Sequence, residues 1–72
     1  MNLTTKNDDL IASRLSALLK KYEKNPEVIE EIRSKVTMFG INRGIARTLK
    51  SKKSEVNLTK EFLKFITTLE KR

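Results

Sequence analysis

Seven of the 16 basic residues fall between Glu31 and Glu55, a stretch that contains no acidic residue. They are Arg33, Lys35, Arg43, Arg47, Lys50, Lys52 and Lys53. The other nine basic residues are balanced by the 9 acidic ones, so this window accounts for the whole formal net charge of +7. A concentrated positive field attracts polyanions and speeds their encounter with the surface that carries it. The window is therefore the candidate binding region.

The residue types in this window suit contacts with nucleic acid. Arginine bonds guanine through two parallel hydrogen bonds, an asparagine amide pairs with adenine, and lysine ammonium groups contact phosphates. At the start of a helix that lies in the major groove, Asn42, Arg43 and Arg47 would meet base edges. The predicted nucleic-acid-binding set is Asn42, Arg43, Arg47, Lys50, Lys52, Lys53, Arg33 and Lys35.

The chain offers little for catalysis. It has no cysteine and no histidine, which removes thiolate ligands, the commonest general base and the commonest transition-metal ligand. Asp8 with Asp9, and Glu30 with Glu31, point about 100° apart on a helix, so neither pair converges as a catalytic dyad does. No glycine-rich phosphate loop occurs. We therefore expect no enzymatic activity, no metal site, no cofactor and no small-molecule substrate.

Apolar residues recur at helical spacing, so the expected fold is all-α, a small bundle of three to four short helices. The first helix is expected over 8–24, with Asn7 as its cap. The second is expected to begin at Asn25 and Pro26 and to end at Gly40, a residue type that commonly terminates helices. The predicted inward stripes of these two helices are Leu10, Ile11, Leu15, Leu18, Leu19 and Tyr22, and Val28, Ile29, Ile32, Val36 and Phe39.

The third segment, 42–53, is expected to be amphipathic, with its apolar side in the core and its basic side in solvent. The predicted inward sector is Ile41, Ile45 and Leu49, and the opposite sector is Arg43, Arg47 and Lys50. A polar connection over 51–56 leads to a fourth helix, capped by Asn57 or Thr59. Its predicted inward stripe is Leu58, Phe62, Phe65, Ile66 and Leu69.

Two helices joined by a short turn at Gly40, the second of them basic, have the outline of a helix-turn-helix. A DNA reader of this size normally binds as a homodimer, and Leu63 on the fourth helix marks the expected dimer surface. Duplex DNA is favoured over RNA because single-strand readers stack bases on exposed aromatic rings. Here the aromatic residues lie in the apolar stripes, and Phe39 beside the turn is the one candidate for exposure.

The alternative is a helical module that binds an acidic protein partner. The segments 41–49 and 58–69, joined by a polar loop, resemble the C-terminal hairpin of the small immunity proteins that protect bacteriocin producers. The resemblance covers about the last thirty residues, rests on amphipathic spacing, and implies a basic cytoplasmic antiparallel bundle. An inhibitor of a host enzyme would also be a small helical protein without distinctive sequence motifs.

Size and composition predict one small helical domain over 1–72, with 1–6 and 70–72 frayed. No apolar run approaches the ~18 residues that a transmembrane helix needs, and the first nine residues lack the apolar core of a signal peptide. We therefore expect a cytoplasmic protein.

Overall fold

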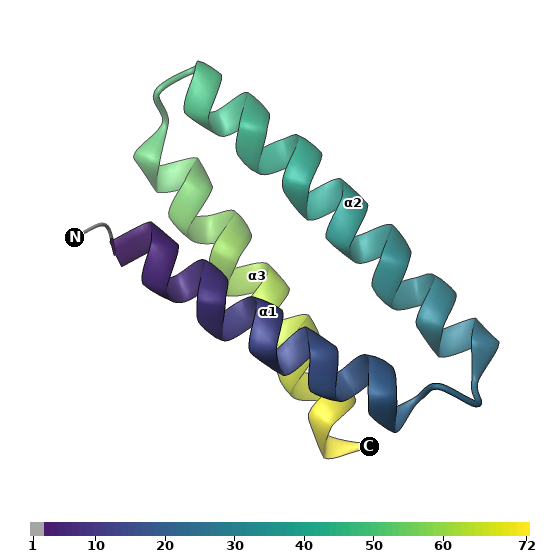
Figure 1. Ribbon diagram of the computed structural model, residues 1–72. Coiled ribbons are helices and arrows are strands. Elements are labelled where there is room, and N and C mark those ends of the chain that lie inside the picture. Colours follow the sequence, from purple (N-terminus) through teal and green to yellow (C-terminus); the bar gives the residue numbers. More distant parts are fainter. Residues whose placement is uncertain (1–2) are drawn as a thin grey trace.

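The computed structural model describes the backbone of residues 3–72 and the side chains from Asp8 onward. Three helices account for almost all of it: α1 (Leu3–Lys21), α2 (Pro26–Thr48) and α3 (Lys52–Lys71) (Figure 1). The all-α prediction is confirmed, and the count of helices is three over this range. The predicted fraying at Met1 and Asn2 lies outside the described residues.

The start of α2 follows the prediction, because Asn25 caps it by accepting a hydrogen bond from the backbone N–H of Val28 and Pro26 occupies the first turn. The start of α1 does not follow the prediction. This helix begins at Leu3, so residue 7, the expected cap, lies inside it.

The predicted turn at Gly40 is wrong. The helix α2 continues for 23 residues through Gly40 and Gly44, and neither glycine has a positive φ. The segments 26–39 and 42–48 are therefore one helix, and the helix-turn-helix outline is not formed.

The actual turn lies ten residues later, at Lys50. Its φ is 56°, in the left-handed region that glycine usually occupies at the end of a helix. The N–H of Lys50 donates to the carbonyl of Arg47 at 3.0 Å, and the N–H of Ser51 donates to that of Ala46 at 2.9 Å. This pair of bonds is a Schellman motif with lysine in the glycine position. Ser51 then caps α3 by accepting from the N–H of Ser54.

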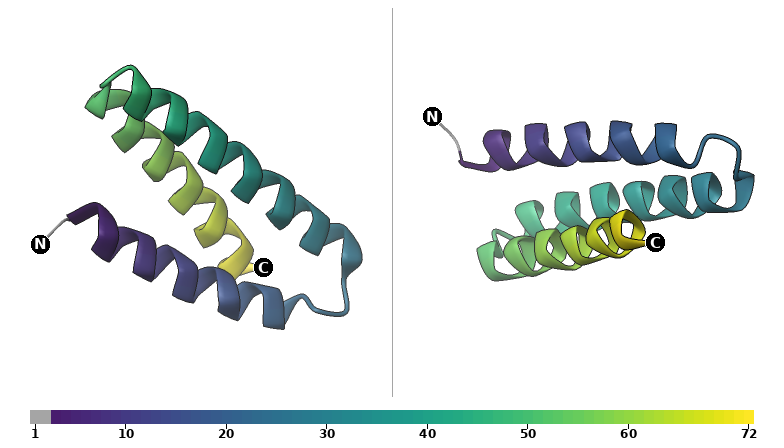
Figure 2. Two further views of the ribbon diagram at one scale, coloured as in Figure 1. Left: turned by 45° about the horizontal axis from the view of Figure 1, so that its top comes forward. Right: turned by 90° about the horizontal axis from the view of Figure 1, so that it is seen from below.

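The helices α2 and α3 form an antiparallel hairpin, and α1 lies against it on one side (Figure 2). The core is made by one side of each helix, with Ile32, Ile66 and Leu69 almost completely buried. The Phe39 and Phe62 rings stack with their centroids 4.4 Å apart, which fastens the middle of α2 to α3. The buried cluster is Ile11, Leu18, Val28, Ile32, Phe62, Ile66 and Leu69.

The expected dimer surface is also corrected. Leu63 is half-buried and packs against this cluster, so it does not stand out from the fold. Most residues in the predicted inward stripes of the first and fourth helices are buried or half-buried. Leu10 and Leu19 are the exposed exceptions.

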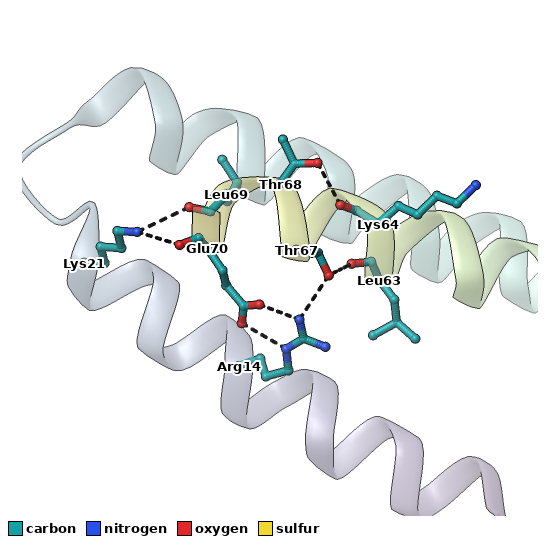
Figure 3. A network of polar contacts seen from close by, with 8 residues as sticks. All are labelled: Arg14, Lys21, Leu63, Lys64, Thr67, Thr68, Leu69 and Glu70. Atoms are coloured by element: carbon teal, nitrogen blue, oxygen red, sulfur yellow. Dashed lines mark hydrogen bonds and ion pairs between the residues drawn. The ribbon is translucent and has the colours of Figure 1, made fainter. Parts of the chain in front are cut away.

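Polar contacts fasten α1 to the C-terminal end of α3 (Figure 3). The guanidinium group of Arg14 donates to both carboxylate oxygens of Glu70, and to the hydroxyl of Thr67 at 3.3 Å. Lys21 donates to the carbonyl of Glu70 at 3.1 Å, and the hydroxyl of Tyr22 donates to that of Leu69 at 2.7 Å. Lys21 and Tyr22 thereby satisfy carbonyls that the last turn of a helix leaves without intrahelical partners.

The position of the turn makes a test of the fold. Nothing lies within 4 Å of a Cβ added at Gly40, so Gly40→Ala is expected to raise the free energy of unfolding by about 0.5–1 kcal/mol. Lys50→Gly is expected to raise it by about 1 kcal/mol, since glycine adopts the left-handed region without strain. Urea denaturation followed by circular dichroism measures both changes. A turn at Gly40 would reverse both signs.

Glu70 gives the fold a defined acid sensitivity. Its hydrogen bonds from Arg14 hold the pKa of its carboxyl below the ordinary value of 4.5. The stabilisation is therefore present above that value and is lost as the pH falls through the lowered pKa of the folded state. Glu70→Gln is expected to destabilise the protein at pH 7 and to have no effect near about pH 2.

Urea denaturation at the two pH values measures this difference, with Glu23→Gln as a control that removes an exposed carboxylate without an ion pair among the described side chains. An equal effect of Glu70→Gln at both pH values would mean that the ion pair contributes nothing.

Candidate binding surfaces

The continuity of α2 reverses the predicted orientation of its C-terminal half. A helix turns by about 100° per residue, so the inward side set by Ile32 and Phe39 comes round again at Arg43 and Ala46. Ala46 is buried and the side chain of Arg43 is only 18% exposed. A break in the helix at Gly40 would have allowed the residues after it to take a different orientation. Because the helix is unbroken, the predicted inward sector points into solvent.

Arg43 is held inside the bundle. Its guanidinium group donates to the two carboxylate oxygens of Asp8, at 2.5 and 3.0 Å, and lies 4.8 Å from the centroid of the Phe39 ring. Asp8 belongs to α1, so this fork connects α1 with α2. From the sequence, Asp8 was considered only as half of a pair with Asp9, and its contact with Arg43 was not foreseen.

Arg47 is also engaged, although it is more exposed. Its Nε donates to Glu55 of α3 at 2.9 Å, across the turn at Lys50. Two of the three side chains predicted to reach base edges are therefore ion-paired between helices. The third, Asn42, is half-buried at the edge of a groove of about 350 Å³ between α2 and α3.

The remaining predicted residues stay on the surface. Lys50, Lys52 and Lys53 gather at the turn between α2 and α3, all exposed. Arg33 is exposed, and the ammonium group of Lys35 lies 5.7 Å from the Phe65 ring centroid. None of these five side chains makes an ion pair within 8–72. The structure thus brings the three lysines together. Arg33 and Lys35 lie away from them, closer to the N-terminal end of α2.

The helix α3 carries a basic surface that the sequence analysis missed. Spacings of seven, four and seven residues place four of its five lysines within a sector of about 40°, and these four extend over roughly 27 Å along the axis. All are exposed, and none is ion-paired in the part of the chain with described side chains. We call these four residues the lysine row: Lys53, Lys60, Lys64 and Lys71.

The row has one acidic neighbour on its own helix, Glu61, which precedes Lys64 by three residues. Glu61 is about 80° away around the helix, and Glu55 and Glu70 are further and already paired with arginines. The signal was present in the sequence, but it needed a helical wheel of residues 52–71. A count of charges along the chain hides it, because Glu55, Glu61 and Glu70 alternate with the lysines.

A second surface runs along the outside of α2. Met38, Ile41, Ile45 and Leu49 are 53%, 53%, 54% and 72% exposed and fall on one side of the helix. Three of them were predicted to lie in the core. An apolar stripe of this kind on the surface of a small protein is typical of an interaction site. We call these four residues the α2 stripe.

The aromatic rings are all in or against the core, including Phe39, which stacks on Phe62. The side chains from 8 to 72 include no cluster of acidic residues arranged to hold a metal ion. None of the three helices is long and apolar enough to cross a bilayer. The chain matches no known protein family, and comparison with curated proteins and with solved structures also gave no match.

The Arg43 contacts lead to a stability prediction. Arg43→Ala removes a two-bond ion pair and a contact with an aromatic ring, so it is expected to lower the free energy of unfolding by about 1 kcal/mol. Arg33→Ala, which removes an exposed and unpaired arginine of the same helix, should change it by less than about 0.5 kcal/mol. Equal effects of the two substitutions in urea denaturation would contradict the inward position of Arg43.

Proposed function

We propose that this protein binds nucleic acid without catalysing a reaction, as a small accessory or regulatory protein of the cytoplasm, and that duplex DNA is its preferred partner. The observation that supports the proposal best is the lysine row on α3, together with the neighbouring Lys50 and Lys52 at the turn. These six ammonium groups are exposed and unpaired among the described side chains, so they are available to a polyanion.

The chemistry of these groups favours phosphates over bases. Lysine is a compact point charge that contacts phosphates without reading sequence, whereas base recognition uses the forked donors of arginine. Arg43 and Arg47 are engaged in ion pairs, which removes them from a base-reading role in this conformation. The proposal is therefore binding to the phosphate backbone, with little discrimination among sequences.

The absence of an exposed aromatic side chain in residues 8–72 favours a duplex over a single strand, because single-strand binders stack bases on aromatic rings. An extended row of about 27 Å also suits a stiff partner that presents phosphates over a comparable length.

A second candidate function is that of a protein-interaction module, which includes an immunity-type protein or an inhibitor of a host enzyme. The α2 stripe favours it, since half-exposed apolar residues at helical spacing suit a helix or groove of another protein. A partner with an acidic rim would match Lys50 and Lys52 at one end of this stripe.

Fluorescence anisotropy with a labelled DNA duplex, from about 50 to 200 mM salt, tests the nucleic-acid proposal. Each phosphate that a lysine neutralises contributes about −0.9 to the slope of log K against log salt. Six contacts predict a slope near −5, and Lys60→Ala/Lys64→Ala should reduce its magnitude by about 1.8.

The matched control is Lys20→Ala/Lys24→Ala, which removes the same charge from two exposed positions, one in the last turn of α1 and one in the connection to α2. If both double variants weaken binding equally, the duplex responds to net charge alone and the lysine row is not the site. If native binding is absent at about 150 mM salt, the interaction-module candidate replaces the proposal.

A further inference from the structure

The apolar residues of the α2 stripe have the spacing of coiled-coil contact positions, and the positions that continue this spacing on the outer side of α2 are the polar Glu31, Ser34 and Thr48. Positions 31, 34, 38, 41, 45 and 48 alternate in steps of three and four residues, as the contact positions of a coiled coil do. All six residues are exposed, and the apolar ones among them are Met38, Ile41 and Ile45, with Leu49 adjoining. The outer side of α2 is therefore shaped to pack against one further helix.

Charge changes sign along this outer side. Its N-terminal end carries Glu27, Glu30 and Glu31 with Lys35 at its flank, so this end is acidic overall. Its middle is the uncharged α2 stripe, and Lys50 and Lys52 follow in the turn and at the start of α3. All six charged residues are exposed and none is ion-paired within the described side chains. A partner helix that complements this side must therefore be basic at one end, apolar in the middle and acidic at the other.

We propose that the occupant is a second copy of this chain, with the two α2 helices packed antiparallel through the α2 stripe. In that orientation each acidic end lies toward the basic end of the partner, and the apolar residues meet in the middle. A parallel pair would place like charges together at both ends. A two-fold dimer needs only this one self-complementary surface.

The glutamates also argue against an anionic membrane as the occupant. A helix that lies on such a membrane carries basic residues beside its apolar side, whereas this one carries three carboxylates at one end. The inference is independent of nucleic-acid binding, because size in the absence of DNA tests it. The α2 stripe and the lysine row also lie on different helices.

Sedimentation velocity of the protein alone, over roughly 1 µM to 1 mM, tests the dimer. We expect a concentration-dependent shift from monomer to dimer in the native chain. Ile45→Lys should raise the dimer dissociation constant at least about tenfold, since each dimer loses two apolar contacts. Ile41→Lys serves as a second variant, and circular dichroism checks that each variant is folded.

The matched control is Val56→Lys, which adds the same charge at an apolar residue that is 51% exposed on α3, away from the α2 stripe. It should leave the dissociation constant unchanged. A native chain that stays monomeric over the whole range overturns the proposal. So does a dimer that is indifferent to Ile45→Lys and Ile41→Lys.

Cross-linking tests the orientation, since the chain has no cysteine of its own. With the stripe centred between residues 43 and 44, residue 38 of one copy faces residue 49 of the other. An oxidised mixture of Met38→Cys and Leu49→Cys chains should give mainly the mixed disulfide, identified by mass. Two Leu49→Cys residues of an antiparallel dimer would be about 16 Å apart along the axis, too far to bond. Predominance of like-with-like disulfides would overturn the antiparallel arrangement.

The same samples separate the other occupants of the α2 stripe. If the native chain is monomeric but binds vesicles with anionic lipids, and Ile45→Lys abolishes that binding, the surface is a membrane contact and the dimer is excluded. Failure of the DNA experiment has no bearing on these outcomes, and a monomer can still pass the DNA experiment.

Discussion

The phase of α2 is the constraint on which the rest of this structure depends. An unbroken α-helix carries its orientation forward by about 100° per residue, so residues at its start decide what faces the core near its end. Ile32 and Phe39 pack on α3, and this places Arg43 and Ala46 on the inward side a few residues later. The apolar residues between these positions in the sequence therefore face solvent, although apolar side chains of this kind are normally buried.

An inward cation needs a partner, because a charge withdrawn from water is costly without one. Asp8 supplies that partner from α1, and the Phe39 ring covers one side of the guanidinium group. The position of α1 is thus linked to the phase of α2 at one end and to the last turn of α3 at the other, through Arg14, Lys21 and Tyr22. An arginine that looked available for a ligand instead connects two helices.

Much of the fold could be predicted from local signals. Asn25 with Pro26 marks the start of α2, and the apolar spacing identified most of the core in α1 and α3, including Leu18, Phe62 and Ile66. The failures in α2 share one physical origin, which is that a glycine permits a turn without requiring one. Gly40 stays helical because its neighbours continue to pack and hydrogen-bond, while Lys50 adopts a left-handed conformation that no local sequence signal assigned to it.

That single error explains why the candidate site was only partly foreseen. Moving the turn from Gly40 to Lys50 turned Arg43 and Arg47 toward acidic partners and exposed Ile41 and Ile45. Lys50, Lys52 and Lys53, which were predicted to lie at the end of the helical segment 42–53, are exposed at the actual turn as well. The lysine row was missed for a different reason. The lysines and glutamates of α3 alternate along the sequence, and they lie on different sides only once the segment forms a helix.

The hydrogen bond from Tyr22 to Leu69 has a spectroscopic consequence. The chain contains one tyrosine and no tryptophan, so its near-ultraviolet absorbance and intrinsic fluorescence above the weak phenylalanine band come from Tyr22 alone. The hydroxyl of that residue donates to the last turn of α3. The protein therefore carries a built-in optical probe for the docking of α1, which reports on this contact while the far-ultraviolet signal reports on all three helices together.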